Sequence, residues 1–461
     1  MQTISPGSGD GRSPVVTRFA PSPTGQVHIG NIRVAIYNWL FARHHGGRFL
    51  LRIEDTDRAR STDEAVRALL EAMEWLGLDY DGEPVFQSRR REAHLEAADR
   101  LLAAGAAYRT RKGEGAGEVI VFRMPPENME FEDLVRGRLK KAADDLQDFV
   151  IVRSDGTPVF HLANVVDDID MGVTHVIRGD DHIENTFRHL ALYRALGAEP
   201  PFFAHLPMIV NDQGKPYSKR DGAAYVGEFR RQGYLPEAVF NYLVLLGWSP
   251  GDDREILSRD ELIRLFDLDR VRPSASRMDL QKLMWMNGEY IRALPEEDYQ
   301  RRFRQALEEA GLLSGAEDEQ YVQRVGELLR ARLRYFGQVK EMAVYFFRED
   351  YAWDMRAVEK RFRVENARDR LRECGELMAQ VDPFVAADIE REVRAAAERR
   401  GLKAAVYIHL LRVAVSGTDR GPGLFEMLEL LGRDRVLARI QRALRELPFS
   451  DLQKGTAGQQ P

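Results

Sequence analysis

The chain has 461 residues, too many for one compact core, and this length predicts about three domains. Hydrophobic residues make up 44% of it and charged residues 30%, which excludes collagen-like and disordered classes. A net charge of -6 argues against indiscriminate polyanion binding. The only cysteine, Cys374, excludes internal disulfides and a cysteine-based zinc site, as expected in a reducing compartment. No apolar run reaches the roughly 20 residues of a membrane span, so no membrane partner is expected.

Residues 15–57 contain a predicted strand, a loop and a helix in succession. The β-rich run at 15–19 stops at two prolines and Gly25, which neither continue a strand nor start inside a helix. After His28, apolar residues recur with i, i+3, i+4, i+7 spacing, which predicts one buried helix face. The free N–H groups and the dipole at such a helix N-terminus favour a bound phosphate.

His28 has two interpretations. A lone histidine beside a helix most often caps or packs, whereas in this loop its imidazole can donate to a phosphate oxygen on which charge develops. Gly25 and Gly30 allow the backbone to approach a ligand closely. The loop context favours the phosphate interpretation.

A second predicted strand, 48–53, ends in acidic residues. Open α/β sheets place ligands at the carboxyl ends of their strands, so Glu54, directly after this strand, is well placed to meet a ligand ammonium group. Asp55 and Asp57 are equally compatible with a solvated loop before a helix predicted from Ser61 to Leu76.

The middle of the chain is predicted to be an insertion followed by a return to the sheet. Short apolar runs alternate with charged turns from Tyr108 to Asp155, and an apolar alternation returns at 157–164. A strand at 174–178 then ends in Arg178, a helix follows, and one more strand is expected at 202–210.

Residues 211–222 are a polar, glycine-bounded loop that carries the cations Lys215, Lys219 and Arg220. Such a loop suits a clamp that closes on phosphates, and its simpler interpretation is an exposed turn. Beyond this loop the pattern is helical to the end. Arginines interleaved with Tyr and Phe over 317–372 are either solvating charges or groups that stack on RNA bases.

Together these motifs resemble a class I aminoacyl-tRNA synthetase of the bacterial glutamyl type. PSPTGQVHIGN at 21–31 resembles the HIGH signature, and Ser218-Lys219-Arg220 resembles the end of the KMSKS loop. The resemblance extends over residues 15–447 and includes RIEDTD at 52–57, HLANVVDD at 161–168, VIRGDDH at 176–182 and LRVAVSG at 411–417.

The resemblance implies a fold and a domain order. The expected fold is α/β, a split Rossmann-type parallel-sheet catalytic domain with an inserted α+β subdomain, followed by all-helical stem-contact and anticodon-binding domains. The expected segments are a disordered extension at 1–14, the first catalytic half at 15–105, the inserted acceptor-binding subdomain at 106–172, the second catalytic half with the KMSKS loop at 173–222, the stem-contact domain at 223–315, the anticodon-binding domain at 316–449 and a flexible tail at 450–461.

The resemblance also implies a reaction. L-Glutamate and ATP, which brings Mg²⁺, condense to glutamyl-adenylate, and the acyl group then moves to the 3′ end of the glutamate tRNA; positioning and charge neutralisation carry this chemistry. The implied roles are catalysis for His28 and Lys219; ATP binding for Thr24, His28, Gly30, Asp181, Lys219 and Arg220; and glutamate binding for Arg18, Ala20, Ser22, Glu54, Phe160, Asn164 and Arg178. No metal ligand and no zinc site are expected, and the family implies a cytoplasmic monomer.

Departures from the family pattern keep alternatives open. Phe160 stands where the family often has Tyr, and Pro216 and Tyr217 interrupt the KMSKS motif. Arg178 favours glutamate, because a guanidinium fork matches a carboxylate. The alternatives are a glutaminyl-tRNA synthetase, a queuosine-glutamylating paralogue, a nucleotidylyltransferase and a catalytically altered tRNA-binding paralogue. The helical C-terminal half argues against the first three, and charging of the glutamine tRNA depends on anticodon contacts.

Overall fold

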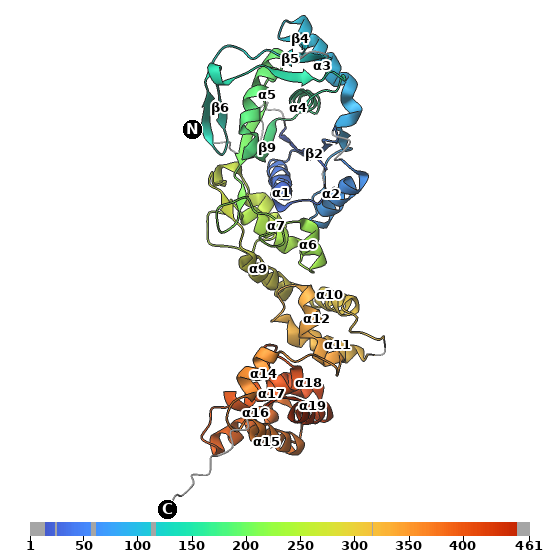
Figure 1. The fold of residues 1–461 in the computed structure, drawn as a ribbon, viewed down its shortest axis with the longest axis vertical. Helices are drawn as coiled ribbons and strands as arrows, with labels where there is room; N and C mark the ends of the chain where they lie inside the picture. The colour runs from blue at the N-terminus through green and yellow to red at the C-terminus, as the bar shows by residue number, and fades with distance from the viewer. Residues whose placement is uncertain (1–13, 24, 57–60, 112–116, 316, 450–461) are drawn as a thin grey trace, which may run out of the picture. The chain divides into compact units, whose positions relative to one another are not determined.

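The structure is a computed structural model that describes residues 14–23, 25–56, 61–111, 117–315 and 317–449. It consists of two compact units, Met1–Met286 and Asn287–Pro461 (Figure 1). The predicted extension, apart from Pro14, and the predicted tail lie outside the described residues, as do Thr24 and Asp57.

The first unit contains a sheet divided into two halves, one parallel and one mixed. One half has the order β1-β2-β3, with β1 at Val16–Phe19, β2 at Arg48–Ile53 and β3 at Val85–Phe86. The other has the order β7-β6-β10-β9, in which β6, β10 and β9 are parallel and β7 is antiparallel to β6. These strands span Gly137–Lys141 (β7), Met129–Asp133 (β6), Phe202–Leu206 (β10) and His175–Gly179 (β9).

The two halves meet where β1 and β9 begin. Thr174 donates from its backbone nitrogen to the Val16 carbonyl at 2.9 Å. Further along, Asn38 of α1 contacts both strands: its side-chain Nδ2 donates to the Ile177 carbonyl at 2.9 Å, and its backbone carbonyl accepts from Thr17 Oγ1 at 2.9 Å. The divergence of β1 and β9 opens a crevice at their carboxyl ends, the position at which α/β sheets bind ligands.

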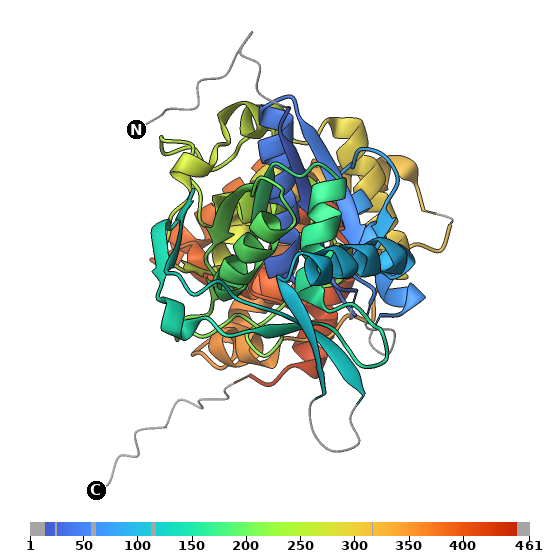
Figure 2. The ribbon, with the colours of Figure 1, turned by 90° about the horizontal axis from the view of Figure 1, so that it is seen from above.

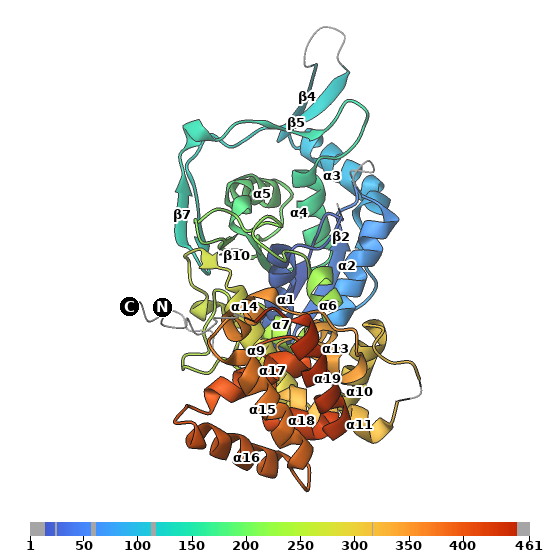
Figure 3. The same cartoon turned by 60° about the horizontal axis from the view of Figure 1, so that its bottom comes forward.

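Helices cover both faces of this sheet. Helix α1, Ile29–His44, packs against β1, β2 and β9, the strands on either side of the divergence (Figure 2). The β6–β7 hairpin lies on the opposite side of α4 and α5 from α2 and α3 (Figure 3). These helices span Asp63–Trp75 (α2), Arg91–Ala103 (α3), Phe160–Asp170 (α4) and Ile183–Ala195 (α5), and a separate sheet holds β4 (Ala107–Arg111), β5 (Glu118–Phe122) and β8 (Phe149–Val152).

Two local expectations were wrong. The alternating residues 157–164 enter helix α4 at Phe160. This window contains only the first five residues of α4, too few to reveal the helical spacing of its polar residues His161, Asn164 and Asp168. The single strand expected at 202–210 ends at Leu206 because Pro207 has no N–H to donate, and a separate strand β11, Ile209–Val210, pairs with β12, Ser276–Arg277.

The rest of the described chain is mostly helical, which confirms the predicted fold class. No helix among the described residues is long and apolar enough to cross a membrane. Helices of the first unit are α6 (Val226–Arg231), α7 (Pro236–Leu245) and α8 (Arg259–Leu265), and α9 (Leu280–Ala293) runs across the unit boundary. The second unit contains α10 (Glu296–Glu309), α11 (Glu319–Arg330), α12 (Val339–Met342), α13 (Val344–Phe347), α14 (Met355–Phe362), α15 (Ala367–Gln380), α16 (Ala386–Arg399), α17 (Ala405–Ser416), α18 (Leu424–Leu431) and α19 (Arg433–Glu446).

Candidate active site

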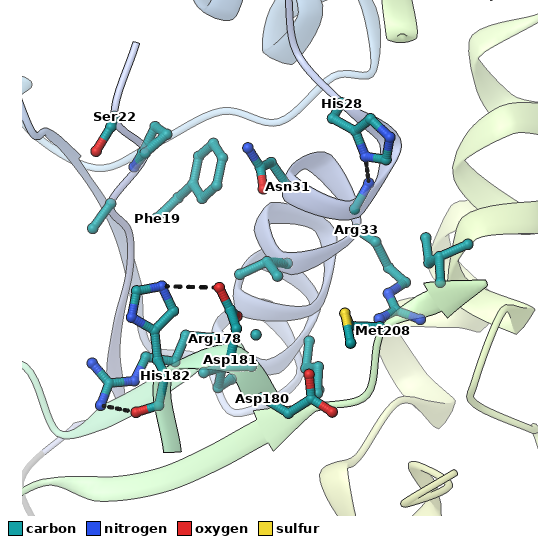
Figure 4. Close-up of a pocket in the computed structure, with 18 of the residues that line it drawn as sticks. Phe19, Ser22, His28, Asn31, Arg33, Arg178, Asp180, Asp181, His182 and Met208 are labelled. Carbon is teal, nitrogen blue, oxygen red and sulfur yellow. Dashed lines mark hydrogen bonds and ion pairs between the residues drawn. The ribbon is translucent and has the colours of Figure 1, made fainter. Parts of the chain in front are cut away.

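A pocket of about 670 Å³ occupies the crevice at the carboxyl ends of β1, β2 and β9. Figure 4 shows His28 at one end of it and Arg178 with His182 at the other. The predicted site residues that line it are Arg18, Ala20, Ser22, His28, Gly30, Glu54, Phe160, Asn164, Arg178 and Asp181. The divided sheet therefore brings together residues that are far apart in the sequence.

His28 caps helix α1 and still keeps one ring nitrogen for another partner. Its Nδ1 accepts a hydrogen bond from the Gly30 backbone N–H at 3.1 Å, so the ring proton lies on Nε2. Burial lowers the pKa of His28, and a backbone hydrogen bond with Tyr217 acts in the opposite direction. The residue is therefore a neutral donor at neutral pH, and the capping and ligand-binding interpretations are compatible.

A network of buried charges lies between β1, β2 and α4, and among Arg18, Arg52 and Asp168 it is Arg18 that lines the pocket. Arg18 Nε donates to Asp168 Oδ1 at 3.0 Å, and Arg52 donates to the same oxygen. Burial opposes ionisation of Asp168, but the two guanidinium groups outweigh it and hold the pKa of the carboxyl below its usual range. Asp168 thus fixes Arg18 with one side of its guanidinium group toward the pocket.

Glu54 is anchored to the same network. Its Oε1 accepts from Asn164 Nδ2 at 2.8 Å and from Arg52 Nη2 at 3.2 Å. Burial raises the pKa of Glu54, and Arg52 and Arg18 only partly offset this. A carboxylate in this position gains from a further cationic partner, which a ligand ammonium group supplies.

Arg178, at the end of β9, is buried without a carboxylate partner among the described residues. Nε donates to His205 Nε2 at 3.2 Å, Nη2 donates to Thr186 Oγ1 at 2.7 Å, and Nη1 lies 3.4 Å from His189 Nδ1. Burial and the neighbouring Arg18 lower its pKa to about 10, so it remains charged at neutral pH.

The histidines around Arg178 are neutral and leave it as the positive charge at this end of the pocket. Burial and nearby arginines lower the pKa of His161 and of His182 to about 4, and that of His189 well below its usual value. At neutral pH these rings are uncharged. This end of the pocket therefore holds an unneutralised cation, which favours an anionic ligand.

The loop at 211–222 does not bring its cations into the pocket. Lys219 and Arg220 are exposed and do not line it, whereas Pro216 and Tyr217 do. Asp221 holds the loop in a tight turn by accepting from the backbone nitrogen and hydroxyl of Ser218, both at 2.9 Å.

Other acidic residues of the predicted motifs have local roles. Asp55 accepts from the backbone nitrogen of Ser88 at 2.7 Å and from its hydroxyl at 2.6 Å, so it fixes the chain before α3. Asp181 lies at the pocket rim with 68% of its side chain exposed, 3.7 Å from His182.

Sequence reasoning assigned no role to Arg52, Asp168, Arg33, Asp133 or His205. Arg33 lines the pocket while donating to the carbonyls of Pro207 and Leu246, the latter at 2.9 Å. An arginine or histidine inside an apolar strand, as at Arg52 and His205, indicates a buried polar network, since a charged group is rarely buried without a partner.

One group of side chains has the spacing of a metal site. Ligand atoms of His44, His45 and Asp267 lie within 4.8 Å of one another, but none of these residues lines the pocket. His44 Nδ1 is already hydrogen bonded to the Ile263 carbonyl at 2.8 Å. The expectation of no zinc site stays a prediction.

Comparison with known proteins identifies the family. The model of the catalytic domain of class I tRNA synthetases (E and Q) matches residues 14–116 and 110–285, and an anticodon-binding domain model matches 298–444. Glutamate–tRNA ligase 1 of Caldanaerobacter subterraneus subsp. tengcongensis is 38% identical, with 94% of this chain and 98% of the relative covered. The chain belongs to the glutamate–tRNA ligase family of class I synthetases.

Other relatives agree with this assignment. Glutamate–tRNA ligase 1 of Gluconacetobacter diazotrophicus is 44% identical to this synthetase, with 92% of this chain and 98% of the relative covered. The crystal structure of a glutamate tRNA ligase from Elizabethkingia meningosepticum in complex with its amino acid superimposes with a TM-score of 0.82 at 30% identity, covering 95% of this chain and 100% of that chain. The resemblance inferred from the motifs is confirmed.

The buried ion pairs of the synthetase lead to a stability prediction. Asp168→Asn leaves two buried guanidinium groups without their shared carboxylate, so the free energy of unfolding should fall by roughly 3 kcal/mol at pH 7. Urea denaturation followed by circular dichroism measures it. Asp170→Asn, in the same helix with a side chain 48% exposed, is the matched control and should change stability by less than about 1 kcal/mol.

The pH dependence of this difference has a defined sign. Because the folded-state pKa of Asp168 is depressed, its contribution is present above the unfolded value of about 3.9 and is lost as the pH falls through the folded value. The gap between the unchanged protein and Asp168→Asn should shrink in acid. A gap that is equal at pH 7 and in acid would contradict the assignment of the ion pair.

Proposed function

We propose that this chain ligates L-glutamate to the 3′ end of the glutamate tRNA at the expense of ATP. The α-carboxylate of glutamate attacks the α-phosphate, the bond to the β-phosphate breaks, and pyrophosphate leaves. A ribose hydroxyl of the terminal adenosine then attacks the acyl carbon, and AMP leaves. The protein contributes orientation and charge stabilisation to both steps.

Arg178 carries this proposal. Within the described part of the chain, the buried guanidinium group of Arg178 has only neutral partners, which suits it to a ligand carboxylate, and Arg18 places a second guanidinium group in the same pocket. We assign the side-chain carboxylate of glutamate to these two arginines. A neutral glutamine amide would leave the charge uncompensated, so the pocket disfavours glutamine.

The other groups of the amino acid have matching partners. Glu54, whose anchored carboxylate lies at the end of β2, is assigned to the α-ammonium group. Asn164 holds Glu54, while Ala20, Ser22 and Phe160 line the walls.

ATP is assigned to the end of the pocket at the N-terminus of α1. Gly30 and the helix N-terminus suit the phosphates, and His28 offers Nε2–H as a donor once its bond with Tyr217 is given up. Asp181 at the rim is assigned to the nucleoside. Thr24, Lys219 and Arg220 complete the assigned set, and the last two require closure of the 211–222 loop. Mg²⁺ enters with the phosphates, its preferred ligands.

The wider assignments rest on the family. The domain limits given above remain proposals, as do a monomeric state and a cytoplasmic location. The match of residues 298–444 to an anticodon-binding domain supports the tRNA partner. Among the described arginines of that unit, several have acidic neighbours, such as Arg330 with Glu296 and Arg324 with Glu429 at 3.1 Å.

A charging assay tests the function directly. With ATP and Mg²⁺, purified protein should attach labelled glutamate to the glutamate tRNA, and labelled glutamine should give less than about one hundredth of that rate. The same assay with the glutamine tRNA determines whether the protein also attaches glutamate to that tRNA. Efficient use of glutamine, or no charging at all, would refute the proposal; the second result is expected of an altered paralogue.

Arg178→Ala should damage glutamate use selectively. Removing one partner of a buried charge pair should lower kcat/KM for glutamate by on the order of 10²- to 10³-fold, while the KM for ATP changes little. Arg194→Ala, on α5 with a side chain 50% exposed, is the matched control. Pyrophosphate exchange in the presence of tRNA measures both constants, and an unaltered glutamate KM and kcat would remove Arg178 from the specificity assignment.

Lys219→Ala should slow adenylate formation by on the order of 10²-fold, because loop closure would bring this cation to the phosphates. Single-turnover formation of the adenylate measures the step. Lys140→Ala, on β7 with a side chain 63% exposed, is the control. The same measurement on Lys215→Ala shows whether the lysine before Pro216 contributes. A Lys219→Ala rate equal to that of the control would show that the loop cation is not used.

A further inference from the structure

Arg178 depends on a histidine for its orientation. Its Nε–H donates to His205 Nε2 at 3.2 Å, and the Thr186 hydroxyl lies 3.0 Å from the same ring nitrogen. His205 lies on β10, directly beside Arg178 in the parallel register of β9 and β10, and is fully buried. The side chain that faces the pocket is thus held from behind by a neighbouring strand.

The hydrogen bond from Arg178 fixes the protonation of His205. A guanidinium group has only donors, so Nε2 must offer its lone pair, and the neutral ring must then carry its proton on Nδ1. Nδ1 lies 2.6 Å from Asp133 Oδ2, a carboxylate that only accepts. Asp133 therefore selects the single tautomer of His205 that can accept from Arg178.

Asp133 is the last residue of β6, in the β6–β7 hairpin that pairs with β10 in the second half of the sheet. Its Oδ1 accepts from the backbone N–H groups of Val135, Arg136 and His205 at 3.0, 2.8 and 3.2 Å. These bonds fix the turn and the strand pairing. The other oxygen, Oδ2, accepts a hydrogen bond from the His205 ring, and the turn does not depend on this contact.

The three side chains form a line from the hairpin to the pocket. Asp133 and His205 side chains have no exposed surface, so water does not replace either bond. A residue that orients a ligand-binding side chain from behind in this way commonly sets its affinity.

We propose that Asp133 is a positioning residue for amino-acid specificity, holding His205 in the Nδ1–H tautomer so that Arg178 is aimed at the ligand carboxylate. This inference rests on the proposed function, because the ligand carboxylate is that of glutamate. It gives the β6–β7 hairpin a role in amino-acid selection.

Asp133→Asn is the informative substitution. The asparagine oxygen can keep all three backbone bonds of Oδ1, but its NH₂ group then faces Nδ1 and favours the Nε2–H tautomer, which opposes the donor of Arg178. The glutamate KM should rise by about 10- to 100-fold and the ATP KM should change by less than about twofold. Glu132→Gln, the exposed neighbour on β6, removes the same charge and should change neither constant.

Two readouts separate this role from a structural one. Nitrogen-15 NMR of histidine-labelled protein, with the His205 signals assigned by their loss in His205→Gln, should show the tautomer switch in Asp133→Asn. The amide oxygen of His205→Gln can accept from Arg178 without a tautomer choice, so adding Asp133→Asn to this background should have little further effect.

The outcomes are decisive in each direction. A switched tautomer with an unaltered glutamate KM overturns the inference, as does an equal loss from Asp133→Asn with and without His205→Gln. If Asp133→Asn does not fold, two variants of His205 are compared instead. His205→Gln keeps an acceptor for Arg178 and His205→Met has no matching acceptor, so the kcat/KM for glutamate should be at least about tenfold higher in His205→Gln. Equal values of kcat/KM overturn the inference. If the unchanged protein does not activate glutamate, it is the proposed function that fails.

Discussion

The site is organised around an excess of buried positive charge: within the described residues, the arginines in and behind the pocket are not all paired with a carboxylate. Arg18 and Arg178 line one pocket, and Arg52 is buried behind it. The carboxylates in direct contact with Arg18 and Arg52 are Asp168 and Glu54. Burying an unpaired charge is costly, so an arginine that stays unpaired in the protein gains most from a bound anion. The pocket therefore favours a ligand that brings a negative charge to Arg178.

The divergence of β1 and β9 makes this imbalance possible. Where the two strands begin, Thr174 and Val16 are joined by a backbone hydrogen bond. Further along, each strand is hydrogen bonded to Asn38 of α1 instead, Thr17 to its backbone carbonyl and Ile177 to its side chain. Arg18 lies on β1 and Arg178 on β9, so the two arginines come from opposite sides of the crevice between these strands. The same geometry places the N-terminus of α1, with His28, at the other end of the crevice (Figure 4).

Much of this site could be predicted from sequence because its parts are local. The strand, loop and helix around His28 and the acidic end of β2 are set by short-range patterns, and the motifs identify the family. The network behind the site could not be predicted: Asp133 and His205 are 72 residues apart and meet only because β6 joins β10 in a parallel pairing. The start of helix α4 was missed because the short window 157–164 alternates like a strand and holds only the first turn and a half of the helix.

The sequence by itself determined the family and the fold class, and it predicted ten of the residues that line the pocket, because the motifs place chemically suited side chains next to predictable strand and helix ends. Only the tertiary structure decided which of those side chains already have partners. Arg18 is paired with Asp168 whereas Arg178 has neutral partners, and Lys219 lies outside the pocket in this conformation of its loop. Whether a charged side chain has an oppositely charged partner depends on burial and on contacts between distant segments, and the sequence alone does not reveal these.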